Sequence, residues 1–126
     1  DEFINREIVK KYLERLGFSV DQAVEGEDCL KRFKLGKYDL IMMDLQMPVL
    51  DGFQTAQQIR RLEEQEVVDK RVPILALSAS VTGKVWNKCK AVGMNGYLSK
   101  PFKTEEFQQK VKEILFGQFL NSSRTL

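Results

Sequence analysis

The sequence predicts a doubly wound α/β fold with a parallel sheet. Two runs, Leu40–Met43 and Pro73–Leu77, are apolar at every position, which is typical of strands buried on both faces of a parallel sheet. Stretches with apolar residues at helical spacing precede, separate and follow these runs. Such alternation indicates a fold in which helices cover both faces of one sheet.

The N-terminal third is expected to form two helices and one strand. Apolar residues recur at helical spacing over residues 4–16, and Gly17 follows as a stop, so we predict an amphipathic helix. The alternating segment Phe18–Ala23 predicts a strand. A short helix should follow over Gly26–Gly36.

The rest of the chain continues the alternation. Helices are predicted over Phe53–Leu62 and Val81–Val92, with a solvated, charged segment from Glu63 to Arg71 between the first helix and the second apolar run. Gly96–Ser99 fits a short strand. The last helix should begin near Thr104, a good N-cap. We expect one domain over residues 1–116 and a polar, frayed tail over residues 117–126.

The composition is that of a soluble, single-domain protein. The 126 residues are 43% hydrophobic and 30% charged, which suits one core. No apolar run approaches the roughly 20 residues that span a bilayer, and no signal peptide stands at the N-terminus. We therefore expect a cytoplasmic domain without direct membrane contact. The net charge of +2 is small and evenly mixed, so nucleic acid is not an expected partner.

Cysteine and histidine usage narrows the chemistry. Cys29 and Cys89 lie in helical patterns without a CxxC motif, and we interpret both as buried small hydrophobes. The chain contains no histidine. This excludes a Ser-His-Asp triad and histidine autophosphorylation within these residues.

Polar residues stand where the predicted strands end. Asp44 and Ser78 follow the two apolar runs, Lys100 follows the short strand, and Asp1 precedes the first helix. In doubly wound sheets, ligands bind at the carboxyl ends of the strands. Two carboxylates, a hydroxyl and an ammonium at one edge can hold a divalent cation and a phosphoryl group together.

The same residues carry a resemblance to the response-regulator receiver family of two-component signalling. Met42–Gly52 resembles the phospho-acceptor strand and its turn, Leu77–Ala79 the switch segment, and Gly96–Pro101 the lysine loop. Ile4–Glu7 also resembles receivers attached to hybrid histidine kinases. The resemblance implies a flavodoxin-like (βα)5 fold with strand order 2-1-3-4-5.

The resemblance implies a role for each residue at the strand ends. Asp44 would be the nucleophile that accepts a phosphoryl group from the phosphohistidine of a histidine kinase or a histidine phosphotransfer protein. Mg²⁺ would be bound by the carboxylates of Asp1 and Asp44 and by the backbone carbonyl of Gln46. Lys100 would neutralise a phosphoryl oxygen. Ser78 would donate a hydrogen bond to the phosphate.

Further roles concern the switch and the surface. The resemblance implies that movement of Ser78 lets Tyr97 swing inward, and that a cis bond before Pro101 aims Lys100 at the site. Trp86 lies one position off the inward stripe of its helix and should be partly exposed. It is either incidental or an interface anchor, and a dimer is one possible outcome.

Structural interpretations stand beside these functional ones. An aspartate after a strand often caps the next turn, and Ser78 and Lys100 taken singly are ordinary turn and surface residues. Asp51 and Gly52 are expected to shape a turn and cap the following helix.

Three functions stay open. The first is a phospho-accepting receiver that switches conformation, with self-phosphotransfer and slow autodephosphorylation as its catalysis. The second is a degenerate receiver that acts as a phosphorylation-independent binding module. The third is an unrelated phosphohydrolase, which would need an acid where Gln46 stands.

The family's first strand is not in the sequence. In the order 2-1-3-4-5 that strand lies between Phe18–Ala23 and Leu40–Met43, and the family places Asp1 at its carboxyl end. Neighbouring strands lie about 4.8 Å apart, so backbone hydrogen bonds cannot cross the gap that its absence leaves. We therefore expect an apolar strand and a further acid immediately before Asp1 in the natural protein. The alternative is a domain swap in which residues 114–120 of a second copy fill the slot.

Overall fold

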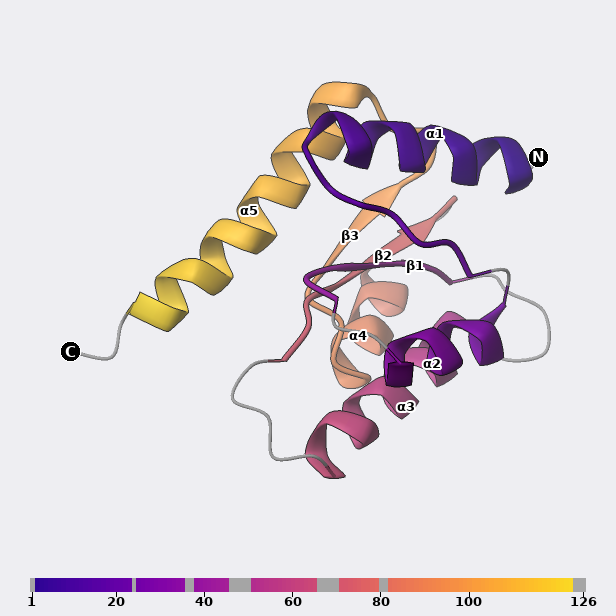
Figure 1. Cartoon of the computed structure of the whole chain (residues 1–126), viewed down its shortest axis with the longest axis vertical. Coiled ribbons are helices and arrows are strands. Elements are labelled where there is room, and N and C mark those ends of the chain that lie inside the picture. Colours follow the sequence, from indigo (N-terminus) through magenta and orange to yellow (C-terminus); the bar gives the residue numbers. More distant parts are fainter. Residues whose placement is uncertain are drawn as a thin grey trace.

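A computed structural model gives the fold over residues 2–23, 25–35, 38–45, 51–65, 71–79 and 82–123 (Figure 1). Helices alternate with strands along most of the chain. In order, the elements are α1 Glu2–Arg15, α2 Gly26–Leu35, β1 Ile41–Asp44, α3 Gly52–Gln65, β2 Ile74–Ser78, α4 Gly83–Ala91, β3 Gly96–Ser99 and α5 Thr104–Ser123.

The three strands form one parallel sheet in the order β1-β2-β3. Asp44 at the end of β1 lies opposite Leu77, and Ser78 at the end of β2 lies opposite Ser99. The carboxyl ends of the strands therefore meet at one edge. The predicted fold class is confirmed, and the sequence of neighbours agrees with the last three strands of the expected order.

The helices cover both faces of the sheet. α1 and α5 lie on one face, and α2, α3 and α4 lie on the other (Figure 1). Alternate residues of β2 face the two layers: Ile74 and Ala76 pack toward α3 and α4, whereas Leu75 and Leu77 pack toward α1 and α5. Every residue of β2 is buried. This two-sided burial is the physical reason for its unbroken apolar run.

The segment Phe18–Ala23 corrects the prediction from sequence, because it is not a strand. A strand needs a neighbour within hydrogen-bonding distance. Among the described residues, β1 pairs with β2 alone, and a cavity separates its other side from residues 18–23. The segment has the alternating pattern, but the structure places no strand of the described ranges beside it.

Two further predictions differ from the structure. α5 continues to Ser123, so residues 117–123 of the expected tail are helical; an isolated glycine such as Gly117 costs a helix only about 1 kcal/mol. Glu63, expected at a solvated helix end, is buried and paired with Arg60.

In the described part of the chain, none of the helices has the length and the apolar character that a membrane span requires.

Candidate functional site

The centre of the site is an ion pair between Asp44 and Lys100. Asp44 closes β1, and Lys100 directly follows β3. Lys100 Nζ lies 2.9 Å from Asp44 Oδ2. The side chains are 29% and 21% exposed, so a ligand can reach the pair while the surrounding protein still limits screening by water.

Ser78 lies on the strand between these two residues. Its backbone carbonyl accepts a hydrogen bond from Lys100 N at 2.8 Å, and Leu45 N donates to the neighbouring Leu77 O at 3.0 Å. Backbone hydrogen bonds therefore connect the ends of all three strands. Ser78 is buried, so its position is fixed by the sheet. The structure thus brings together Asp44, Ser78 and Lys100 at one sheet edge.

The start of α3 packs tightly against the end of β1. A Cβ atom on Gly52 would lie 2.5 Å from Asp44 O and 2.9 Å from Leu45 Cα. Asp51 caps the helix, since its Oδ1 accepts from Gln54 N at 2.8 Å while Gln54 Oε1 accepts from Asp51 N at 3.1 Å. The predicted capping role of Asp51 is confirmed. The close approach at Gly52 was not foreseen, although an Asp-Gly pair after a strand is the signal that could have indicated it.

The expected metal ligands are partly outside the described residues. Asp1 and Gln46 both lie there, while Asp44 presents its carboxylate at the open edge of the sheet. Among the described residues, no group of three or more acidic, cysteine or histidine side chains is placed to hold a metal ion. Carboxylate and carbonyl oxygens are the ligands that Mg²⁺ prefers, so Asp44 fits as one member of such a set.

Tyr97 lies within β3, and Lys100 directly follows that strand. The Lys100–Pro101 peptide bond is cis. Tyr97 is 37% exposed, and its ring lies 5.2 Å from the half-buried ring of Trp86. Lys110 Nζ lies 5.8 Å from the Tyr97 ring. The contact between Trp86 and Tyr97 joins α4 to β3, and sequence reasoning did not anticipate it.

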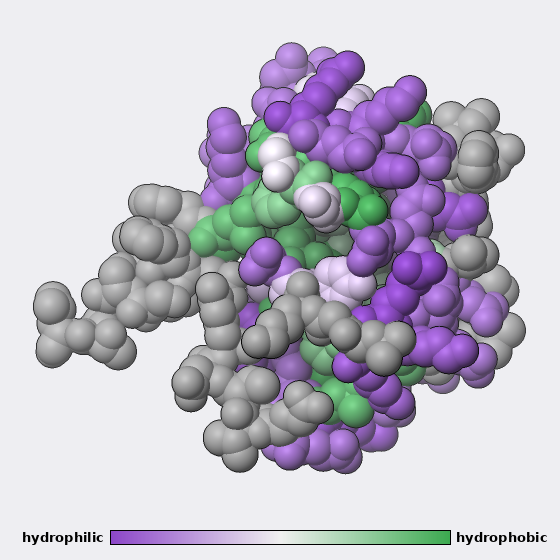
Figure 2. Space-filling model, viewed as in Figure 1, coloured by the Kyte–Doolittle hydropathy of each residue, from purple (hydrophilic) through white to green (hydrophobic). Residues whose placement is uncertain are grey.

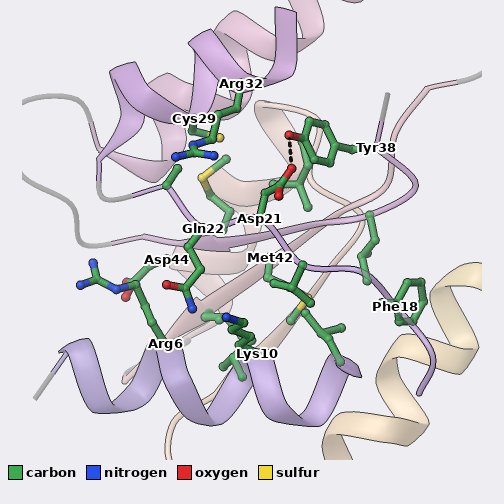
Figure 3. Close-up of a pocket in the computed structure, with 18 of the residues that line it drawn as sticks. Arg6, Lys10, Phe18, Asp21, Gln22, Cys29, Arg32, Tyr38, Met42 and Asp44 are labelled. Carbon is green, nitrogen blue, oxygen red and sulfur yellow. Dashed lines mark hydrogen bonds between the residues drawn. The ribbon is translucent and has the colours of Figure 1, made fainter. Parts of the chain in front are cut away.

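A cavity of about 550 Å³ opens beside the ion pair. It runs between α1, residues 18–23 and the free side of β1, and reaches Asp44 and Lys100 at one end. In the space-filling view, hydrophobic residues show at the surface between α1 and the elements below it (Figure 2). In the close-up, Arg6 and Lys10 extend from α1 toward the cavity (Figure 3). The lining therefore mixes apolar and charged side chains, with the cations of Arg6 and Lys10 on the side of α1.

Polar contacts hold the far wall of the cavity. Tyr38 Oη donates to Asp21 Oδ2 at 2.8 Å (Figure 3), and this hydrogen bond raises the pKa of Tyr38. Gln22 Nε2 donates to Glu7 Oε1 of α1 at 3.4 Å. Burial, and next the negative charge of Asp28, raise the pKa of the Cys29 thiol on the same wall. The two hydrogen bonds thus connect Asp21 to Tyr38 and Gln22 to α1.

Known proteins share this fold and much of this sequence. The family described as the response regulator receiver domain matches residues 1–112. The peroxide stress-activated histidine kinase mak1 of Schizosaccharomyces pombe is 38% identical over 98% of this chain, and hybrid signal transduction histidine kinase B of Dictyostelium discoideum is 40% identical over 84%. The chain spans less than a tenth of the length of these relatives, 8% and 6%.

Solved structures show the same architecture. The receiver domain of the sensor histidine kinase PA1611 from Pseudomonas aeruginosa, with a magnesium ion coordinated in its active site cleft, has a TM-score of 0.77 and 34% identity; the match covers 90% of this chain and 89% of that one. The receiver domain of Ssk1 from Saccharomyces cerevisiae, in a co-crystal with the histidine phosphotransfer protein Ypd1, has a TM-score of 0.83 and 34% identity, with coverage of 92% and 84%.

Proposed function

This chain belongs to the family of response regulator receiver domains of two-component signalling, and we propose that Asp44 accepts a phosphoryl group from a phosphohistidine in a reaction that requires Mg²⁺. The observation that carries the proposal is the 2.9 Å contact between Lys100 Nζ and Asp44 Oδ2 at a partly exposed sheet edge. An ammonium beside the attacking carboxylate is what transfer between two anions needs.

The chemistry follows from these groups. A carboxylate oxygen of Asp44 attacks phosphorus, the P–N bond to the donor imidazole breaks, and that imidazole leaves with the bonding electron pair. Asp44 then carries an acyl phosphate. Lys100 stabilises the negative charge on the phosphoryl oxygens, in place of its present bond to Asp44.

The metal would be held by the carboxylates of Asp1 and Asp44 and by the carbonyl oxygen of Gln46. It would supply positive charge that offsets the repulsion between an anionic nucleophile and an anionic donor. Support comes from the oxygen chemistry of this donor set and from the magnesium ion in the receiver of PA1611.

Phosphorylation would act through Ser78 and Tyr97. Ser78 is buried at the end of the strand next to Asp44, and its hydroxyl would donate a hydrogen bond to the new phosphate. Tyr97 lies against Trp86 at the surface, and its inward movement would change that face. These roles make the domain a switch with slow self-dephosphorylation.

The donor would be a histidine kinase or a histidine phosphotransfer protein. This rests on the hybrid kinases among the relatives and on the Ypd1 complex of the Ssk1 receiver. The parent protein would then be a much longer kinase, with this domain on the cytoplasmic side.

Intact mass measurement after incubation with a small-molecule phosphodonor and Mg²⁺ tests the proposal. We expect one added phosphate on the wild-type chain and none on Asp44→Asn or after chelation of Mg²⁺. Asp39→Asn, a matched change of an exposed carboxylate near the start of β1, should leave the reaction intact. A phosphate on Asp44→Asn, or one mapped to a serine, would refute it. No transfer to the wild-type chain would favour the phosphorylation-independent binding module.

A further inference from the structure

Arg60 forms a partly buried polar network at the edge of the sheet opposite Asp44. Its Nε and Nη2 donate to Gly93 O at 3.0 and 2.8 Å, and Nη2 also donates to Asn95 Oδ1 at 3.0 Å. Nη1 donates to Glu63 Oε1 at 2.6 Å. Arg60 and Glu63 are both buried. One side chain of α3 therefore holds the turn that links α4 to β3.

The partners of Arg60 tie the same turn to β2. Glu63 Oε2 accepts from Val72 N at 2.8 Å, just before β2. Asn95 Oδ1 accepts from Ile74 N, and Asn95 N donates to Ile74 O, both at 2.8 Å. The planar guanidinium fixes the directions of its bonds, so the network holds the turn in one orientation. We call it the Arg60 clamp; it consists of Arg60, Glu63, Gly93 and Asn95.

The clamp holds the carboxyl end of α4. Gly93 has φ +89°, and a Cβ atom there would lie 2.9 Å from Arg60 Cγ and Nε, so the Arg60 side chain packs directly on the Gly93 backbone. Gly93 N donates to Lys90 O at 3.1 Å and Met94 N to Cys89 O at 3.0 Å. Cys89, one turn earlier, is the buried residue of this helix.

The amino end of α4 is held differently. Residues 83–88 are exposed or half-buried. Their contacts with other elements include the Trp86 ring on Tyr97 and Lys88 Nζ at 4.4 Å from the Phe53 ring. Val85 and Trp86 also pack against the core as half-buried side chains. These ring and apolar contacts are less directional than the hydrogen bonds of Arg60, so they can slide. This end also lies closer in the sequence to Ser78, which ends the strand before α4.

We propose that the Arg60 clamp is the pivot of α4, so that the helix swings at its amino end while Gly93 stays fixed. This inference deepens the proposed function and, for the switch itself, rests on it. Arg60 is a positioning residue in this scheme. A change at Ser78 would be converted into a tilt of α4 that alters the contact between Trp86 and Tyr97, and a shift of the whole helix would be prevented.

Amide hydrogen exchange of the unmodified protein tests the pivot without any phosphate. We expect the amides of Gly93, Met94 and Asn95 to be at least about tenfold better protected than those of Asn87 and Lys88, after correction for sequence effects. Arg60→Lys keeps the positive charge but loses the planar guanidinium, which bonds several partners at once. It should raise the exchange rate of the Gly93, Met94 and Asn95 amides about tenfold. Arg61→Lys, at the exposed neighbouring position, should leave the pattern unchanged.

Equal protection at both ends of α4 would overturn the proposal, as would an Arg60→Lys protein whose exchange differs from wild type only by a uniform factor. Arg60→Gln is a stronger test; if it does not fold, Arg60→Lys decides.

Beryllofluoride with Mg²⁺ then tests the motion. In wild type, amide shifts in α4 should be concentrated at residues 83–88, and in Arg60→Lys they should extend to residues 92–95. Shifts spread evenly over α4 in wild type would contradict the pivot. No response in wild type would count against the proposed function, while the exchange pattern still decides whether the clamp anchors α4.

Discussion

At the scale of single residues, the site depends on side chains of ordinary type held at the ends of parallel strands. Asp44 and Lys100 are 56 residues apart in sequence, yet the sheet brings their charged atoms to 2.9 Å. Both are partly exposed, so the pair contributes little to stability, up to about 1 kcal/mol. Its value is chemical, because it places a cation where a phosphoryl group would arrive.

Lys100→Ala should therefore separate function from stability. We expect phosphoryl transfer to fall by about 10²-fold, as for loss of one electrostatic group in an active site, with a change in unfolding free energy within about 1 kcal/mol. Phosphorylation rate by intact mass and denaturant unfolding measure the two effects. Lys103→Ala, an exposed lysine of the same loop, is the control and should change neither. A large loss of stability in Lys100→Ala would show that the lysine is structural.

Alanine substitutions at two glycines should have different effects on the stability of the fold. Gly52→Ala would place a methyl group 2.5 Å from Asp44 O, and backbone must move to relieve it, so we expect a loss of about 1 to 3 kcal/mol together with slower phosphorylation. Gly83→Ala, at the start of α4, meets nothing within 4 Å and should be neutral or stabilise by up to about 1 kcal/mol. Denaturant unfolding of both variants is the measurement. A neutral Gly52→Ala would contradict the close packing of α3 on β1.

At the scale of elements, α4 and β3 form the face that a switch would alter. The rings of Trp86 and Tyr97 lie 5.2 Å apart with an interplanar angle of 51°, which is a favourable tilted contact. A hydrogen bond from Ser78 to a charged phosphate is worth about 1.5 to 3 kcal/mol. That energy can shift an equilibrium between two conformations of similar free energy. It cannot drive a rearrangement that costs more than this amount.

The fluorescence of Trp86, the single tryptophan, should report this shift. We expect its emission to change when beryllofluoride and Mg²⁺ are added to the wild-type protein. In Tyr97→Ala the contact is absent beforehand, so the change should be much smaller. Tyr38→Phe removes a hydroxyl that bonds Asp21 and should respond like wild type. Identical emission with and without the phosphate mimic would argue against a switch at this face.

At the scale of the whole molecule, the main irregularity of the fold is the side of β1 on which no strand pairs with it within the described part of the chain. Ile41 N and Leu45 N donate to Pro73 O and Leu77 O of the neighbouring chain segment. In a parallel pair, alternate residues direct their backbone groups to the same side, so those of Met42 point away from β2. That side faces the cavity of about 550 Å³. An extended chain lying there would find both apolar walls and backbone partners.

We predict that an apolar segment of about ten residues joined before Asp1 stabilises the fold. Burying apolar surface and pairing the edge of β1 should raise the melting temperature by about 5 °C or more and increase Mg²⁺ affinity. Calorimetry and metal titration are the measurements, and protection of the Met42 amide from exchange locates the effect. An extension of the same length rich in glycine and serine is the control.

Equal melting temperatures for the two extensions would show that the slot does not take a strand. A melting temperature of the unextended chain that rises with protein concentration would favour a second copy as the occupant.

The sequence alone indicated the class of fold and three residues that the structure brings together at one edge of the sheet. Runs such as Pro73–Leu77 have no polar position because both faces of β2 are buried, and this pattern is local enough to recognise. Asp44, Ser78 and Lys100 were predictable because each follows a recognisable strand, and parallel strands end at the same edge. The capping role of Asp51 was predictable for a different reason: its partner Gln54 is only three residues away.

Tertiary structure decided what depends on partners distant in the sequence. Residues 18–23 have the alternating pattern of a strand but do not form one. A strand must pair with a neighbour, and a cavity lies between this segment and β1. Glu63 looked like a solvated charge and is buried, because Arg60 and the Val72 amide satisfy it there. The charge of a residue and the pattern around it indicate which local structures and interactions are open to it. Which partner it meets is set by the packing of helices on the sheet, and that information is not local.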